Sequence, residues 1–332
     1  MSHRKDTDYL SISTRIHAME TRLLTRERME RMIDAKDNGE ALKVLEECGY
    51  GDLGRLSAAG LEGMLSNARG AVFQDMAKSV PDPRLVAVFQ LKYDYHNAKT
   101  LVKAQAMGRD PERLLLSGGR YDPKELLEGF GRDDLHGCSE TFSAAVGQAR
   151  ETLAASGDPQ LADVVLDRAC YREMGQLARE SGSSFLEGYV RLAIDAANLR
   201  TAVRCARLDK DSEFLQRVLL PGGNISEHAV ASTKGDARRE LYQAGPLAQA
   251  ASLGARLTQP GGGDLTEFER LCDDAVMGYL AQARRIPFGE QAVVGYLYAR
   301  EAEFTAIRTI LSGRMAGLDA DTIRERLREA YV

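Results

Sequence analysis

The segment Asp94-Tyr95-His96-Asn97-Ala98-Lys99-Thr100 indicates how this chain is built, because the sequence contains it in three related forms. The second form is Asp195-Ala196-Ala197-Asn198-Leu199-Arg200-Thr201, and the third is Glu303-Phe304-Thr305-Ala306-Ile307-Arg308-Thr309. In each form a basic residue stands five positions after an acidic one and is followed by threonine. Self-similarity at a spacing of this length is typical of repeated structural units, so we expect three related units.

The sequence after the first two copies repeats as well. Leu115-Leu116-Ser117-Gly118-Gly119 matches Leu219-Leu220-Pro221-Gly222-Gly223. A glycine pair allows a tight turn, and N-cap residues follow at Asp122 and near Ser226, so a helix, a turn and a second helix are duplicated together. The apolar stripe that begins after Ser184-Phe185-Leu186-Glu187, interpreted as a capping box, predicts a helix of about 25 residues.

Composition and punctuation favour an all-α fold. Aromatic residues make up 6% of the chain and Trp is absent, while alternating apolar and polar stretches typical of strands are missing. Four Asp-Pro pairs predict helix starts, because Asp accepts hydrogen bonds from free amides of a first turn and Pro needs no donor there. These pairs are Asp82-Pro83, Asp110-Pro111, Asp122-Pro123 and Asp158-Pro159.

We expect three similar helical domains, at about residues 1–115, 116–220 and 221–332, with terminal helices free to pack across domain borders. A pseudo-threefold bundle is the simplest closed arrangement of three such units, and an open solenoid is the alternative. The third copy has Ala306 where the others have Asn97 and Asn198, so its polar contact is expected to differ.

No catalytic, cofactor or metal motif is apparent. The chain lacks GxxxxGK[ST], HExxH and GxSxG, and its five cysteines form no CxxC. The formal net charge of −5 disfavours general binding to nucleic acid or anionic lipid. The cysteines are odd in number and widely spaced, so neither disulfides nor zinc is expected and a reducing cytoplasm fits. The charged N-terminus does not resemble a signal peptide, and no uncharged run approaches the roughly 20 residues of a membrane span.

The candidate partner-binding residues are Lys99, Arg200 and Arg308, the bases of the three copies. Acid and base are separated by about 500° of helix rotation, so they are not an i,i+4 pair, and each is expected to reach a different neighbouring helix. Two interpretations follow. The bases either hold helices together within the chain or bind an acidic partner.

Several segments resemble the family of V-type ATPase C subunits, whose eukaryotic relatives are called d subunits. They are residues 9–24 with the core Arg15-Ile16-His17-Ala18-Met19-Glu20, the repeats at 94–101 and 195–201, and residues 303–311. The resemblance implies a funnel of three helical domains around a pseudo-threefold axis. It also implies a non-catalytic protein, one copy per complex and without a cofactor, on the cytoplasmic side of an ion-translocating ATPase or ATP synthase.

In that family a socket receives the central-stalk shaft, the other side rests on the membrane proteolipid ring, and torque passes between them. Because Lys99, Arg200 and Arg308 occupy equivalent positions of the repeats, a closed pseudo-threefold arrangement would place them at related positions around its axis, and we expect them to meet acidic shaft residues if they face the socket. A free α-helical repeat adaptor is the alternative function, and a helical enzyme is a more distant one.

Overall fold

The computed structural model describes residues 4–51, 57–259 and 261–332, and within these ranges the chain is helical and contains no strand. The prediction of an all-α fold is confirmed. The α-helices are α1 (Leu10–Glu20), α2 (Arg26–Asp34), α3 (Asn38–Glu47), α4 (Ala58–Ser79), α5 (Arg84–Met107), α6 (Pro123–Arg132), α7 (Glu140–Ser156), α8 (Pro159–Ser181), α9 (Ser184–Arg207), α10 (Ser212–Val218), α11 (Glu227–Ser232), α12 (Gly235–Leu241), α13 (Ala248–Leu257), α14 (Thr266–Leu280), α15 (Glu290–Met315) and α16 (Ala320–Arg326). Short 3-10 helices cover Asp6–Tyr9, Glu112–Leu114 and Ala281–Arg285.

Most of the predicted helix starts are confirmed by the capping contacts. Asp122 and Asp158 are N-caps whose carboxylates accept from first-turn amides, each with proline next in the chain. Asp82 likewise accepts from the amide of Arg84 at 3.0 Å at the start of α5. Asp110-Pro111 instead precedes only a 3-10 turn. The N-cap of α9 is Ser183, one residue before the predicted capping box, because its hydroxyl reaches the amide of Leu186.

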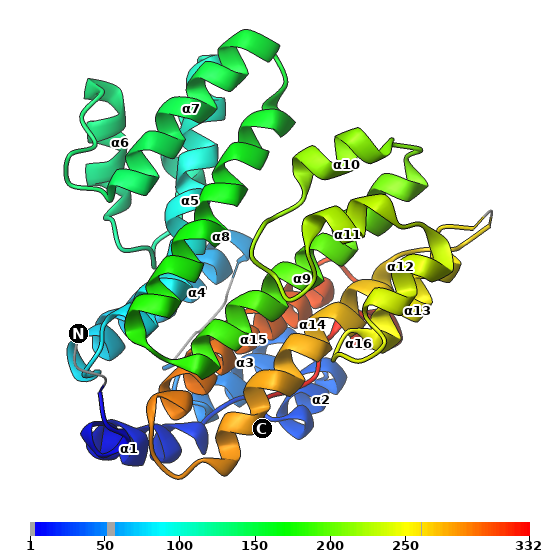
Figure 1. Cartoon of the computed structure of the whole chain (residues 1–332). Helices are drawn as coiled ribbons and strands as arrows, with labels where there is room; N and C mark the ends of the chain where they lie inside the picture. The colour runs from blue at the N-terminus through cyan, green and yellow to red at the C-terminus, as the bar shows by residue number, and fades with distance from the viewer. Residues whose placement is uncertain (1–3, 52–56, 260) are drawn as a thin grey trace.

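Each of the three repeat segments lies on a long helix that packs against a local group of helices. α5 packs on α7 and α8, and α9 packs on α13 and α14. α15, which carries the third copy, packs on α2, α3, α4 and α16. Figure 1 shows α6 to α8 as one arm and α10 to α13 as a second arm, with α1, α2 and α3 at the base beside α15.

The group around α15 is formed by both ends of the chain. Its separate hydrophobic cluster combines residues between Leu24 and Leu65 with residues between Phe304 and Leu327. The helices after the third repeat are too few to cover α15, and the first four helices of the chain cover it instead. The domain ranges 1–115, 116–220 and 221–332 stay a prediction, and this packing joins the outer two of them.

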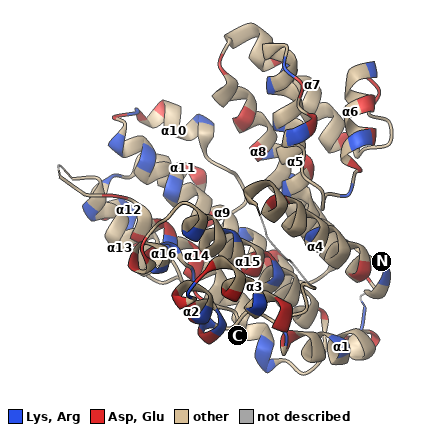
Figure 2. Cartoon of the chain, turned by 180° about the vertical axis from the view of Figure 1, so that it is seen from behind, with Lys and Arg blue, Asp and Glu red and all other residues tan. Residues whose placement is uncertain are grey.

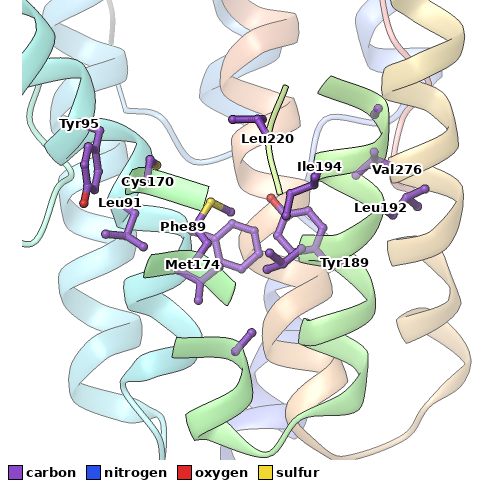
Figure 3. Close-up of a cluster of buried hydrophobic side chains, with 14 of the residues drawn as sticks. Phe89, Leu91, Tyr95, Cys170, Met174, Tyr189, Leu192, Ile194, Leu220 and Val276 are labelled. Carbon is purple, nitrogen blue, oxygen red and sulfur yellow. The ribbon is translucent and has the colours of Figure 1, made fainter. Parts of the chain in front are cut away.

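The three long helices meet at an aromatic centre. The ring of Phe89 on α5 stacks on that of Tyr189 on α9, with centroids 5.3 Å apart, and Tyr189 makes an edge contact with Tyr298 on α15 at 5.9 Å. Figure 3 shows Phe89 and Tyr189 facing one another between their helices. Such pairs add about 0.5–1.5 kcal/mol beyond the burial of their surface. The aromatic centre therefore helps fix the three groups relative to one another.

Candidate functional site: loop clamps and an arginine groove

The first repeat holds the loop that follows α5. Both groups of the Asn97 amide bind the backbone of Leu116, since Nδ2 donates to its carbonyl at 2.9 Å and Oδ1 accepts from its amide at 2.8 Å. One turn earlier, Oδ1 of Asp94 accepts from the amides of Arg120 and Tyr121 at 2.9 and 3.3 Å. Two buried side chains of one helix thus fix both ends of the Gly-Gly turn.

The second repeat makes the same contacts. Asn198 exchanges two 2.8 Å hydrogen bonds with the backbone of Leu220. Asp195 accepts from the amides of Asn224 and Ile225, both at 3.1 Å. We call each pair of acid and asparagine, with the loop it holds, a loop clamp. Burial raises the pKa of Asp195, while these donors act in the opposite direction.

The acid of the first clamp binds a cation, and the acid of the second clamp binds a neutral side chain instead. In the first, Nε of Arg120 donates to Asp94 at 2.7 Å, and its Nη1 donates to Glu173 on α8 at 2.8 Å. In the second, the side chain of Asn224 replaces the guanidinium and donates to Asp195 at 2.8 Å. The first clamp is therefore also tied to a neighbouring helix by charge.

The third repeat keeps the acid and loses the asparagine. Glu303 accepts from the amide of Leu24 at 2.8 Å and from Arg300 at 2.7 Å, and it also binds the hydroxyl of Tyr50. Ala306, at the position of the asparagine, is buried in the hydrophobic cluster of this group. Because Leu24 lies near the N-terminus, Glu303 connects the two ends of the chain.

The three bases are paired with carboxylates of neighbouring helices. The pairs are Lys99 with Asp167 of α8 at 2.6 Å, Arg200 with Glu269 at 2.9 Å and with Asp273 of α14, and Arg308 with Glu62 of α4 at 2.7 Å. The expectation that each base reaches another helix is therefore correct. The acids differ from expectation, because they bind loops, which their spacing along the sequence could not indicate.

A groove lies where α9 and α14 approach the ends of α15 and α16. It has a volume of about 750 Å³, and its charged lining consists of four arginines and one acid: Arg204, Arg308, Arg326, Arg328 and Glu269. Glu269 accepts from Arg204 at 2.7 Å, and Arg328 pairs with Asp273 at 2.6 Å. Figure 2 shows both signs of charge interspersed along the helices, including around α14 and α16. The arginine groove is thus lined mainly by arginines, three of which are paired with carboxylates in or beside the groove.

The three candidate partner-binding residues lie at different places relative to the arginine groove. Arg308 lines it. Arg200 pairs with Glu269 of its wall. Lys99 pairs with Asp167 on the seam between α5 and α8. Sequence reasoning missed Arg326 and Arg328, although the alternating charges of Arg324-Glu325-Arg326-Leu327-Arg328 are a visible signal of an unusual surface.

The part of the chain that the structure describes contains neither a candidate metal site nor a membrane-spanning helix. Within residues 4–51, 57–259 and 261–332, no group of His, Cys, Asp or Glu is arranged to hold a metal ion. Among the helices described for those ranges, none combines the length and apolar character needed to cross a bilayer.

Comparison with known proteins identifies the family. The model of the ATP synthase (C/AC39) subunit family matches residues 12–326, which is nearly the whole chain. The chain belongs to this family.

Similar members come from bacteria and archaea. The C subunit of the V-type sodium ATPase of Enterococcus hirae is 23% identical over 98% of this chain and 99% of its own. The C subunit of the V-type ATP synthase of Thermus thermophilus is 24% identical, with 96% and 98% covered. The C subunit of the A-type ATP synthase of Thermococcus kodakarensis is 21% identical, with 97% and 90% covered. Membership of the C/AC39 family therefore rests on similarity along the entire chain, and the resemblance seen in the repeats is confirmed.

Proposed function

We propose that this protein is the non-catalytic coupling subunit of a rotary V-type ATPase or ATP synthase, joining its central shaft to its membrane proteolipid ring. The observation that carries the proposal is the family match over residues 12–326, together with relatives named as the C subunits of V-type and A-type complexes. In this role the protein sits once per complex on the cytoplasmic side of the membrane and transmits torque for ion transport.

The internal contacts suit a part that carries mechanical load. Two loop clamps and the Glu303 contact tie each long helix to distant backbone. A further tie joins α5 to α15, since Glu301 accepts from the hydroxyl of Tyr93 at 2.5 Å and pairs with Lys92. Hydrogen bonds to the carboxylates of Glu301 and Glu303 each contribute about 1.5–3 kcal/mol and the neutral asparagine bonds about 0.5–1.5 kcal/mol, so relative movement of these helices is costly. Resistance to internal movement is what torque transmission requires.

The arginine groove is the surface on which we expect an acidic partner to bind. Three of its four arginines already pair with carboxylates, and among the described residues Arg326 is exposed and has no ion pair. Exposed charge of one sign speeds encounter with the opposite sign, so Arg326 and the neighbouring guanidinium groups favour an acidic partner. We therefore expect acidic shaft residues near Arg308 in the assembled complex. Contact of Lys99 and Arg200 with the shaft stays a prediction, and the helix contacts of all three bases are sufficient to explain their presence.

A free helical adaptor is the alternative function, and co-purification separates it from the coupling role. A tagged chain expressed in its own organism should retain shaft and proteolipid-ring proteins after gentle detergent extraction. An adaptor that works apart from the complex would retain neither. The isolated chain should also show no ATP turnover above background, and saturable turnover by a shaft-free sample would contradict the non-catalytic assignment.

A further inference from the structure

A second cavity lies in the group around α9, apart from the arginine groove. It has a volume of about 490 Å³ and is formed by α9, α10, α12 and α13. In the first group the chain between the clamped loop and α8 forms α6 and α7, and α7 is a continuous helix of 17 residues, whereas here the chain between the loop and α14 forms three shorter helices, α11, α12 and α13. Residues at the start of α12 and along α13 line the cavity.

A buried arginine is the central polar feature of this cavity. Arg238 is 7% exposed, and its Nε donates to the carbonyl of Val230 at 3.2 Å. The guanidinium also donates to the carbonyls of Ala202 and Thr233. Among the described residues these carbonyls are its partners, and no carboxylate forms an ion pair with it. Removing a charge from water without a counter-ion is costly, so the site is electrostatically incomplete.

More positive charge surrounds Arg238. Lys210, Lys234 and Arg239 also line the cavity. Asp209 and Asp211 line it too, and Asp211 is already engaged as the N-cap of α10, where it accepts from the amide of Phe214 at 2.7 Å. The cavity lining therefore carries four cations and two acids, and one of the cations, Arg239, pairs with Asp236 outside the lining at 3.5 Å. Among the described residues the other three, Arg238, Lys210 and Lys234, have no ion pair, which favours a ligand with more than one negative charge.

The remaining lining is largely apolar and comes from α9 and its neighbours. Leu199, Val203 and Leu215 are buried side chains of this wall. A cavity of this size is within the range of about 300–1,000 Å³ that small-molecule sites occupy. Cations beside an apolar wall suit a molecule with an anionic head and an apolar body. A phosphate monoester carries close to two charges and three strong acceptor oxygens, which several cations can share.

We propose that this cavity binds a small soluble organic phosphate, with its phosphate beside Arg238 and the two lysines and its body against Leu199 and Val203. The ligand neutralises the buried guanidinium and bridges α9 to α12. The site is independent of the coupling role, because it lies within one helical group.

The test measures binding of phenyl phosphate to the full chain by ligand-observed nuclear magnetic resonance. Phenyl phosphate should bind at one site, more tightly than inorganic phosphate, which lacks the body, and than benzoate, which has one charge. The Lys210→Gln, Lys234→Gln double variant changes exposed side chains and should fold normally while losing about tenfold or more in affinity. Arg238→Met should lose at least as much. Arg132→Gln, on an exposed position of α6, is the matched control and should bind as the unchanged protein does.

Several results would overturn the proposal. The first is that the folded protein does not bind phenyl phosphate. The second is that it binds benzoate or inorganic phosphate as tightly as phenyl phosphate. The third is that the folded double variant binds phenyl phosphate with unchanged affinity. Sedimentation with phosphatidylcholine vesicles that contain phosphatidic acid, lost in the double variant, would assign the site to a lipid headgroup and overturn the soluble ligand.

Discussion

A Cβ atom added to Gly223 would overlap Oδ1 of Asp195, so this carboxylate touches the backbone of the loop that it holds. Gly119 and Asp94 have the same close approach in the first repeat. The first glycine of each pair has a positive φ, 107° at Gly118 and 98° at Gly222. The repeated form of the turn thus has two causes, a left-handed residue and a close approach by an acid.

Alanine at Gly119 or Gly223 should destabilise the protein by more than about 2 kcal/mol, because the new methyl group displaces the clamp carboxylate. Urea unfolding of the purified variants measures this change. Gly147→Ala is the control, since that helical position has open space and alanine should stabilise it by about 0.5–1 kcal/mol. Equal midpoints for Gly119→Ala and Gly147→Ala would contradict the clamp.

Removing the amide of Asn97 or Asn198 should lower the free energy of unfolding by about 2–6 kcal/mol. Each alanine variant leaves one buried N–H and one buried carbonyl without a partner, and each orphaned group costs about 1–3 kcal/mol. Gln105→Ala, on an exposed position of α5, provides the comparison and should change stability by less than about 0.5 kcal/mol. Similar losses for Asn97 and Asn198 are expected because their contacts are the same, and a large loss at only one of them would argue against equivalence.

The sequence predicted the clamps only in part. Acid, asparagine and Gly-Gly turn were all visible as repeats, but their contact was not, because helix periodicity says nothing about a loop 19 to 30 residues away. The same limit applies to Glu303, whose partner Leu24 is 279 residues away. The Asp-Pro pairs predicted helix starts more reliably, because the capping aspartate and the first-turn amides that it binds are neighbours in the sequence.

The pH dependence of stability should reveal the burial of Asp195. Burial raises the pKa of this carboxyl above its unfolded value, so the folded protein binds its proton more tightly and this contribution to stability falls as pH rises from the unfolded pKa near 4 through the folded pKa. The free energy of unfolding of the unchanged protein, minus that of Asp195→Asn, should therefore decrease between about pH 4 and pH 7. A difference that stays constant or increases over this range would show that the donors outweigh burial.

Exchanging the charges of Arg308 and Glu62 separates helix packing from partner binding. Arg308→Glu combined with Glu62→Arg keeps an ion pair between α15 and α4, so unfolding stability should stay within about 0.5 kcal/mol. If acidic shaft residues contact Arg308, retention of the shaft on the tagged protein should fall. The matched exchange is Lys99→Glu with Asp167→Lys, which tests whether the first repeat shares that contact. Unchanged retention in both exchanges would leave the bases as helix contacts alone.

The most direct test of the coupling role is ATP-driven ion uptake by membrane vesicles whose ATPase has been depleted of this protein and then supplied with the purified chain. We expect depleted vesicles to show no ATP-driven uptake, and addition of the protein to restore uptake in proportion to ATP hydrolysis. Full ion uptake by vesicles that lack the protein would contradict the account.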